Sequence, residues 1–115
     1  MTASPLPQDR NRRASPRVAI RLPATVTIGD LRKDVQTWDL ARDGMCLIAS
    51  RPITPGTRCR IAFELPVGSE LVAVTATAKI VYSSYSAAGE FRIGAVFLAL
   101  DDAGASAIGA LTASS

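Results

Sequence analysis

Residues 72–82 read VAVTATAKIVY, and this stretch decides the fold. Its even-numbered positions are apolar from Val72 to Tyr82, whereas threonines and a lysine alternate with them on the other parity. Such an alternation predicts a β-strand with one face in a core, because successive side chains of a strand point to opposite sides. We therefore expect an all-β protein in which this strand supplies the longest inward-facing row.

Shorter segments of the same kind lie on both sides of this stretch. Turn residues separate them about every eight to twelve positions, which is typical of an antiparallel barrel or a sandwich. Pro23 in the first segment fits an edge or a bulge, because proline cannot donate to a ladder. After Asp101 and Asp102, which can cap a helix, residues 103–111 predict one short helix packed on the sheet. The predicted strands are residues 18–28, 33–40, 45–49, 58–65, 72–82 and 91–98, and residues 83–90 are predicted as a polar loop.

The positive charge is concentrated at the amino terminus. The chain of 115 residues carries 13 basic and 10 acidic residues, a formal +3, and residues 1–17 hold four arginines and one aspartate. Beyond residue 17, nine basic and nine acidic residues cancel. The excess charge therefore belongs to an amino-terminal arm, which attracts anions in a salt-dependent way. Because Pro5, Pro7 and its charges give it little to bury, this arm is expected to be flexible.

The chain contains no histidine, and its two cysteines, Cys46 and Cys59, form no CxxC pair. These facts exclude Ser-His-Asp and Cys-His catalysis and the common histidine-containing metal sites. We expect no enzyme activity and no metal site, with both cysteines reduced and packed as small apolar residues. No signal peptide and no membrane-length apolar run is present, so the expected location is the cytoplasm.

Two short motifs carry the functional signal. Arg13-Ala-Ser-Pro-Arg17 is an RxxxR motif directly before the first strand, and Asp39-Leu-Ala-Arg-Asp-Gly44 follows the pattern [D/N]xSxxG between the second and third strands. Together with Gly94-Ala-Val-Phe97 near the last strand, they make the chain resemble the PilZ domain family of bacterial cyclic di-GMP receptors over nearly its whole length. The resemblance implies a six-stranded antiparallel barrel with a short C-terminal helix and a flexible basic N-terminal arm.

On this resemblance, residues 1–9 form a flexible tail and residues 10–115 form one domain. The resemblance further implies that cyclic di-GMP binds at one mouth of the barrel and that the arm folds over it. Guanidinium groups make paired hydrogen bonds to phosphate and to the guanine O6/N7 edge, and a carboxylate can accept from the Watson–Crick edge. The candidate ligand-binding residues are Arg12, Arg13, Arg17, Asp39, Ala41 and Gly44, with Arg10, Arg42 and Gly94 as further candidates.

One position departs from the family pattern, because Ala41 stands where the motif has serine. Losing a hydrogen bond costs about 0.5–3 kcal/mol, or roughly threefold to a hundredfold in affinity. We favour weakened but retained binding. Two alternatives stay open: a degenerate PilZ-like protein-interaction module that no longer binds nucleotide, or a small barrel that binds single-stranded nucleic acid. Aromatic residues make up only 5% of the chain, which argues against the second alternative.

Arg12 directly precedes the RxxxR motif and supports a further prediction. The family includes domains that bind one ligand molecule and domains that bind an intercalated pair, and an arginine here resembles the pair-binding type. We expect two molecules of cyclic di-GMP per chain and no cofactor. A domain without an output module acts through other molecules, so the expected partners are cyclic di-GMP and an unidentified downstream protein. We expect a monomer that neither binds nucleic acid nor inserts into membranes.

Overall fold

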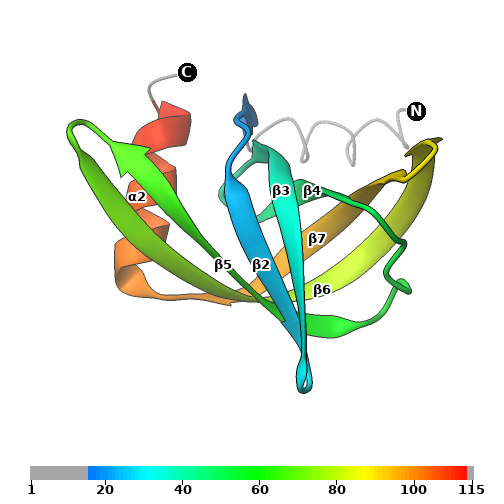
Figure 1. Ribbon diagram of the computed structural model, residues 1–115. Helices are drawn as coiled ribbons and strands as arrows, with labels where there is room; N and C mark the ends of the chain where they lie inside the picture. The colour runs from blue at the N-terminus through cyan, green and yellow to red at the C-terminus, as the bar shows by residue number, and fades with distance from the viewer. Residues whose placement is uncertain (1–15, 114–115) are drawn as a thin grey trace, which may run out of the picture.

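The computed structural model describes residues 16–113, which form a strongly curved sheet and one helix (Figure 1). Every strand pairing is antiparallel. In chain order the elements are β1 (Val18–Ala19), β2 (Pro23–Ile28), β3 (Leu31–Leu40), β4 (Gly44–Ala49), β5 (Arg58–Val67), β6 (Glu70–Ala87), β7 (Glu90–Leu100) and α2 (Asp102–Ala113).

The sheet closes on itself to form a barrel. Its strand order is β1-β3-β2-β5-β6-β7-β4, and an additional pairing of β3 with β4 joins the two ends. The strands from β2 to β7 form this ring, while the two-residue β1 pairs with the last residues of β3, beyond the part that β2 covers. The predicted all-β class and six-stranded barrel are confirmed. Because the two ends of the sheet pair with each other, the fold is a barrel and not a sandwich, and few strand edges stay unpaired.

The inward-facing rows fill the barrel as the alternation predicts. In β6, the side chains at alternate positions from Val74 to Ile80 are at most 1% exposed, whereas the threonines and the lysine between them are exposed. The same alternation holds in β5, where Ile61 and Leu65 are fully buried. Burial of these apolar side chains is the main stabilising contribution, at about 25 cal/mol per Å² of apolar surface removed from water.

Helix α2 packs against β5 and β6 and is the short C-terminal helix that the sequence predicts (Figure 1). Asp101 caps it, because its Oδ1 accepts a hydrogen bond from the amide of Gly104 at 3.0 Å. Ala107 and Ile108 join the buried core. An ideal Cβ at Gly104 would lie 2.8 Å from the side chain of Val74, so the missing side chain lets the helix approach the sheet closely.

The prediction of a polar loop at residues 83–90 is wrong. Strand β6 continues to Ala87 and β7 begins at Glu90, with Gly89 in the turn at a φ of +72°. Residues 84–87 are all exposed, so they supply hydrogen-bonded backbone without burying a side chain. The tip is held by Tyr85 and Phe91, whose rings meet edge to face at 5.7 Å. The polar composition of residues 83–90 therefore did not indicate a strand. The end of β6 is a strand because it pairs with β7.

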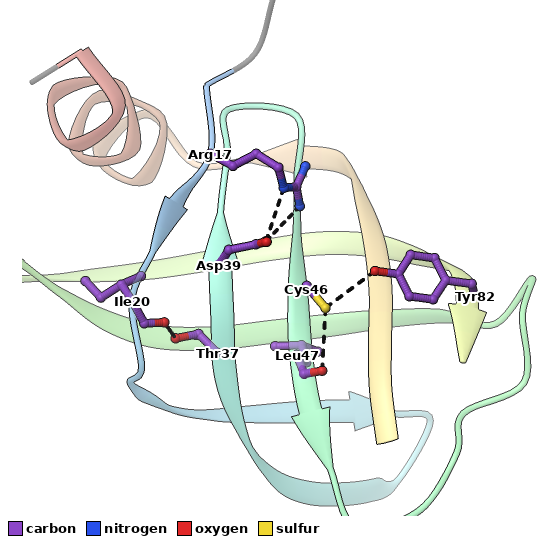
Figure 2. A network of polar contacts seen from close by, with 7 residues as sticks. All are labelled: Arg17, Ile20, Thr37, Asp39, Cys46, Leu47 and Tyr82. Carbon is purple, nitrogen blue, oxygen red and sulfur yellow. Dashed lines mark hydrogen bonds and ion pairs between the residues drawn. The ribbon is translucent and has the colours of Figure 1, made fainter. Parts of the chain in front are cut away.

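The first predicted strand is interrupted between Ala19 and Pro23, and we call residues 17–22 the strap. The strap lies along β3 and is fastened by Thr37, a fully buried polar side chain. The amide of Thr37 donates to the Leu22 carbonyl at 2.8 Å, and Leu22 N donates to Thr37 Oγ1 at 2.9 Å. The same hydroxyl donates to the carbonyl of Ile20 (Figure 2). These bonds hold the chain segment that carries Arg17.

Trp38 holds the strap through a second kind of contact, a cation–π interaction with Arg21. Two guanidinium groups lie over its ring, Arg21 at 3.8 Å from the ring centroid and Arg92 of β7 at 3.5 Å. Cations over an indole face are attracted by its quadrupole, by about 0.5–1 kcal/mol each at exposed sites. The strap, β3 and β7 are thus linked through one aromatic ring.

Candidate functional site

Arg17 and Asp39, two motif residues of opposite charge, meet where the strap joins β3 (Figure 2). Arg17 Nη2 lies 2.8 Å from Asp39 Oδ1, and Nε donates to the same oxygen at 3.2 Å. The hydrogen bond to Asp39 raises the pKa of the Arg17 guanidinium, while partial burial opposes the rise. The two side chains are 46% and 23% exposed, and such surface pairs contribute about 0.2–1 kcal/mol. An anionic ligand can therefore replace Asp39 as the partner of Arg17 at small cost.

Asp39 begins a row of residues that crosses four neighbouring strands. Cys46 lies opposite Asp39, Gly94 opposite Cys46, and Tyr82 opposite Gly94. Residues directly opposite share one face of a sheet, and the clustered core residues of β4 and β7 lie on the other parity, so this row points away from the core, with Cys46 covered to 4% exposure. An ideal Cβ at Gly94 would lie 2.1 Å from the Tyr82 ring. The ring therefore crosses the bare backbone of Gly94, and its hydroxyl donates to Cys46 Sγ at 3.5 Å (Figure 2).

A depression of about 320 Å³ opens beside this row on the outer wall of the barrel. It contains four of the predicted ligand-binding residues and is bounded by the turn between β3 and β4. Its volume is at the lower end of the roughly 300–1,000 Å³ typical of ligand pockets, so additional chain is needed to enclose a dinucleotide. The lining residues are Arg17, Asp39, Asp43, Gly44, Met45, Val81, Tyr82, Gly94, Ala95 and Val96.

A larger depression of about 430 Å³ lies over β2, β3 and β5 and contains none of the predicted site residues. Its charged lining side chains are the carboxylates of Asp34 and Glu64, with no basic group. Carboxylates repel phosphate, so this surface does not suit the anion that the motifs predict. The depression beside Arg17 is also lined by two carboxylates, Asp39 and Asp43, but it has a guanidinium group that the larger depression lacks, and this basic group favours it.

Gly44 is required for a reason other than the one its turn position suggests. Its place in a turn predicts that Gly44 adopts a positive φ. Gly44 does not, because the glycines with positive φ in residues 16–113 are Gly29, Gly56, Gly68 and Gly89. Instead, an ideal Cβ at Gly44 would lie 2.4 Å from the carbonyl oxygen of Ala95. The missing side chain lets β4 and β7 approach at the floor of the depression.

The remaining predicted residues fall into two groups. Ala41 is fully buried and Arg42 is exposed, and neither lines the depression. The amide of Ala41 donates to the carbonyl of Gly44 at 2.8 Å and so closes the turn beside the site. Arg10, Arg12 and Arg13 lie outside the described residues, as does the predicted tail.

Sequence reasoning missed Tyr82 as a site residue and assigned it to the inward-facing row of β6. It is instead 45% exposed at the wall of the depression. The pairing of β6 with β7 shifts register between Ile80 and Tyr82. A bulge of this kind reorients the side chains that follow it. Alternation alone could not show the shift, because it depends on the partner strand.

Titration of Tyr82 tests the contacts of this row. The hydrogen bond to Cys46, followed by burial, raises the pKa of Tyr82 to about 12. The chain has two tyrosines, so in Tyr85→Phe the absorbance change of tyrosinate reports Tyr82 alone. We expect a midpoint near 12 in that variant and a lower midpoint when Cys46→Ala is added. If the midpoint in Tyr85→Phe alone lies near the ordinary tyrosine pKa of about 10, the hydrogen bond between Tyr82 and Cys46 is contradicted.

Between residues 16 and 113, no cluster of three histidine, cysteine, aspartate or glutamate side chains is placed to hold a metal ion. Cys46 and Cys59 are buried free thiols, and burial raises the pKa of Cys59. Within the same range, no helix has the length and apolar character needed to cross a membrane.

The structure is a closed six-stranded antiparallel barrel with the ion pair of Arg17 and Asp39 on its outer wall. A family model for the PilZ domain matches residues 11–114. The chain belongs to the PilZ domain family. PilZ domains are generally cyclic di-GMP receptors and are binding domains rather than enzymes.

A comparison with solved structures supports the fold. The inhibitor of motility MotI/DgrA of Bacillus subtilis is similar with a TM-score of 0.77 and 10% sequence identity. The match covers 90% of this chain and 50% of that one, so this chain spans about half the length of MotI/DgrA. At this identity the likeness concerns the fold alone. A comparison with curated proteins found no match.

Proposed function

We propose that this PilZ domain is a receptor for cyclic di-GMP and binds it in the depression beside Arg17. One observation carries the proposal: a guanidinium group and a carboxylate from the two motifs lie 2.8 Å apart at a depression with a floor of glycine backbone. The ligand presents both partners that this pair needs. Its phosphates accept from a guanidinium, and its guanine edge donates to a carboxylate.

The ligand-free contact between Arg17 and Asp39 then has a functional consequence. Without ligand, Arg17 and Asp39 bind each other. When cyclic di-GMP binds, each of the two side chains exchanges this contact for one to the ligand. Tyr82 adds an exposed ring at the wall, where a purine base can stack for about 1–3 kcal/mol. Arg17 can also stack on a purine face, which lysine does poorly.

The arm supplies the remaining contacts in this proposal. Arg10, Arg12 and Arg13 precede Arg17 by a few residues, so they can reach the same depression. With Arg12 in place, the domain binds an intercalated pair of cyclic di-GMP molecules. Binding orders the arm over the barrel, and this ordering is the signal that a downstream protein detects. The proposal includes a monomeric domain acting in the cytoplasm.

Isothermal titration calorimetry with cyclic di-GMP tests the proposal, with GTP and cyclic GMP as controls. We expect saturable binding of cyclic di-GMP alone, at two molecules per chain, falling to one in Arg12→Ala. A ratio of one that Arg12→Ala leaves unchanged would remove the paired-ligand part. Absence of heat and of a thermal shift at high ligand excess would reject the receptor role.

The alanine at position 41 supports a second candidate function, a protein-interaction module that has lost the nucleotide. The alanine supplies no hydroxyl to the turn beside the depression, where the family motif has serine. Under this alternative, Arg17→Ala changes no ligand signal because none exists. Tighter binding of a single-stranded oligonucleotide than of cyclic di-GMP would instead support the nucleic-acid alternative.

A further inference from the structure

Four basic residues gather on the outer wall of β3, β5 and β6. Arg58 lies opposite Lys79, and Arg60 lies opposite Thr27, which in turn lies opposite Arg32. Opposite residues project to the same side of a sheet, and all four basic side chains are exposed. We call Arg32, Arg58, Arg60 and Lys79 the basic face.

No carboxylate of the described residues forms an ion pair with the basic face. Across residues 16–113, no ion pair within 4.0 Å joins any of its four side chains to a carboxylate. Like charges directly opposite, as in Arg58 and Lys79, destabilise a sheet. The helix does not cover this wall, because α2 approaches β6 from the inward side at Val74. The four basic side chains therefore form no ion pair within 4.0 Å in the described fold, although Asp34 lies two residues from Arg32 on the same strand face.

The surroundings of the basic face indicate the chemistry of a partner. A hollow of about 290 Å³ lies between Arg58 and Arg60 and is lined by hydroxyl-bearing Thr27 and Thr77. No aromatic side chain lines it, whereas proteins that bind single-stranded nucleic acid usually add aromatic stacking to a basic groove. Arg58 and Arg60 are alternate residues of one strand, about 6.8 Å apart along it. Alternate carboxylates of an extended acidic segment have the same spacing.

We propose that the basic face docks an extended segment of a partner protein that is rich in aspartate and glutamate. Arginine forks match carboxylates in paired geometry, and threonine hydroxyls can donate between them. This proposal rests on the proposed signalling through protein contacts and names the chemistry of the partner.

The basic face also adjoins the candidate ligand site. Lys79 lies opposite Val96, and Val96 lies opposite Gly44 in the floor of the depression. With strands about 4.8 Å apart, Lys79 is roughly 10 Å from Gly44 across the wall. A partner docked on the basic face therefore borders the place where the arm closes over the messenger.

Fluorescence anisotropy with a labelled, glutamate-rich peptide tests the docking at low and near-physiological salt. The variant is Arg58→Gln with Arg60→Gln, and the matched control is Lys33→Gln with Arg51→Gln, which removes the same charge from another part of the barrel. We expect the first variant to bind the peptide about fivefold more weakly at low salt, the size expected for two exposed ion pairs. The control is expected to bind within about twofold of the wild type.

Three outcomes of the peptide measurement would overturn the proposal: equal losses in the two double variants, no loss in either, or tighter binding of an oligonucleotide or an anionic phosphatidylserine vesicle than of the peptide. Peptide binding is measured without nucleotide, so it can fail or succeed independently of the receptor role. Cyclic di-GMP titration of Arg58→Gln with Arg60→Gln is expected to match the wild type. If this variant loses affinity for cyclic di-GMP as much as for the peptide, the basic face belongs to the nucleotide site and the docking proposal is overturned.

Discussion

Replacing Arg17 with alanine is expected to weaken cyclic di-GMP binding about a hundredfold, measured by calorimetry. Arg17 can give two hydrogen bonds to charged phosphate oxygens, each worth about 1.5–3 kcal/mol. Part of this is offset, because the bound state gives up the 2.8 Å contact to Asp39, which is a weak surface pair. A net loss of about 2.7 kcal/mol corresponds to the hundredfold change.

A matched control is Arg51→Ala, which removes an exposed arginine outside the depression. We expect its affinity to stay within about twofold of the wild type, since it retains every proposed contact and loses only distant, screened charge. Equal effects of the two variants would mean that net charge, not the position of Arg17, governs binding.

Asp39→Ala separates two roles for the carboxylate. If Asp39 accepts from guanine, the variant loses affinity; if Asp39 only restrains Arg17, the freed guanidinium binds more tightly. We expect a loss. Thermal denaturation should change little, because the lost pair is exposed and worth about 0.2–1 kcal/mol.

Gly44→Ala is expected to lower the free energy of unfolding by about 2–3 kcal/mol, the size typical of overpacking a close-packed site. The added Cβ would lie 2.4 Å from the carbonyl oxygen of Ala95, and backbone cannot swing aside as a side chain can. Strand β4 must separate from β7, which weakens their pairing and deforms the floor of the depression. Chemical denaturation measures the first effect, and a fall of the melting temperature by about 10 °C should accompany it.

The control for this prediction is Gly109→Ala in α2, where an added Cβ would meet nothing within 4 Å. There we expect a gain of about 0.5–1 kcal/mol, since alanine favours a helix more than glycine does. Gly44→Ala as stable as the wild type would show that β4 and β7 can move apart freely. The close contact would then not explain the glycine.

Most of the fold could be predicted from the sequence because its β-strands alternate between an apolar core face and a polar outer face. The row from Val74 to Ile80 is buried as its parity predicts. The alternation failed for residues 83–90, where a strand is held by pairing without burying side chains. It also failed at the strap, where the buried Thr37 holds the chain between two short strands.

Arg17, Asp39, Gly44 and Gly94 were predicted from motifs, and the structure brings them together at one depression. Tyr82 could not be predicted, since its outward direction follows from the register shift after Ile80. The reason for Gly44 was likewise hidden, because it depends on Ala95 of another strand. Each missed feature is a contact between segments distant in the sequence.

The sequence by itself determined the strand pattern, the motif residues and the cationic arm, because periodicity, residue type and charge are local properties of a chain. Only the tertiary structure decided that β3 and β4 close the sheet, that Arg17 rests on Asp39, and that Lys79 borders the ligand depression. These depend on register between strands, and a shift of one residue would turn each side chain to the opposite face of the sheet.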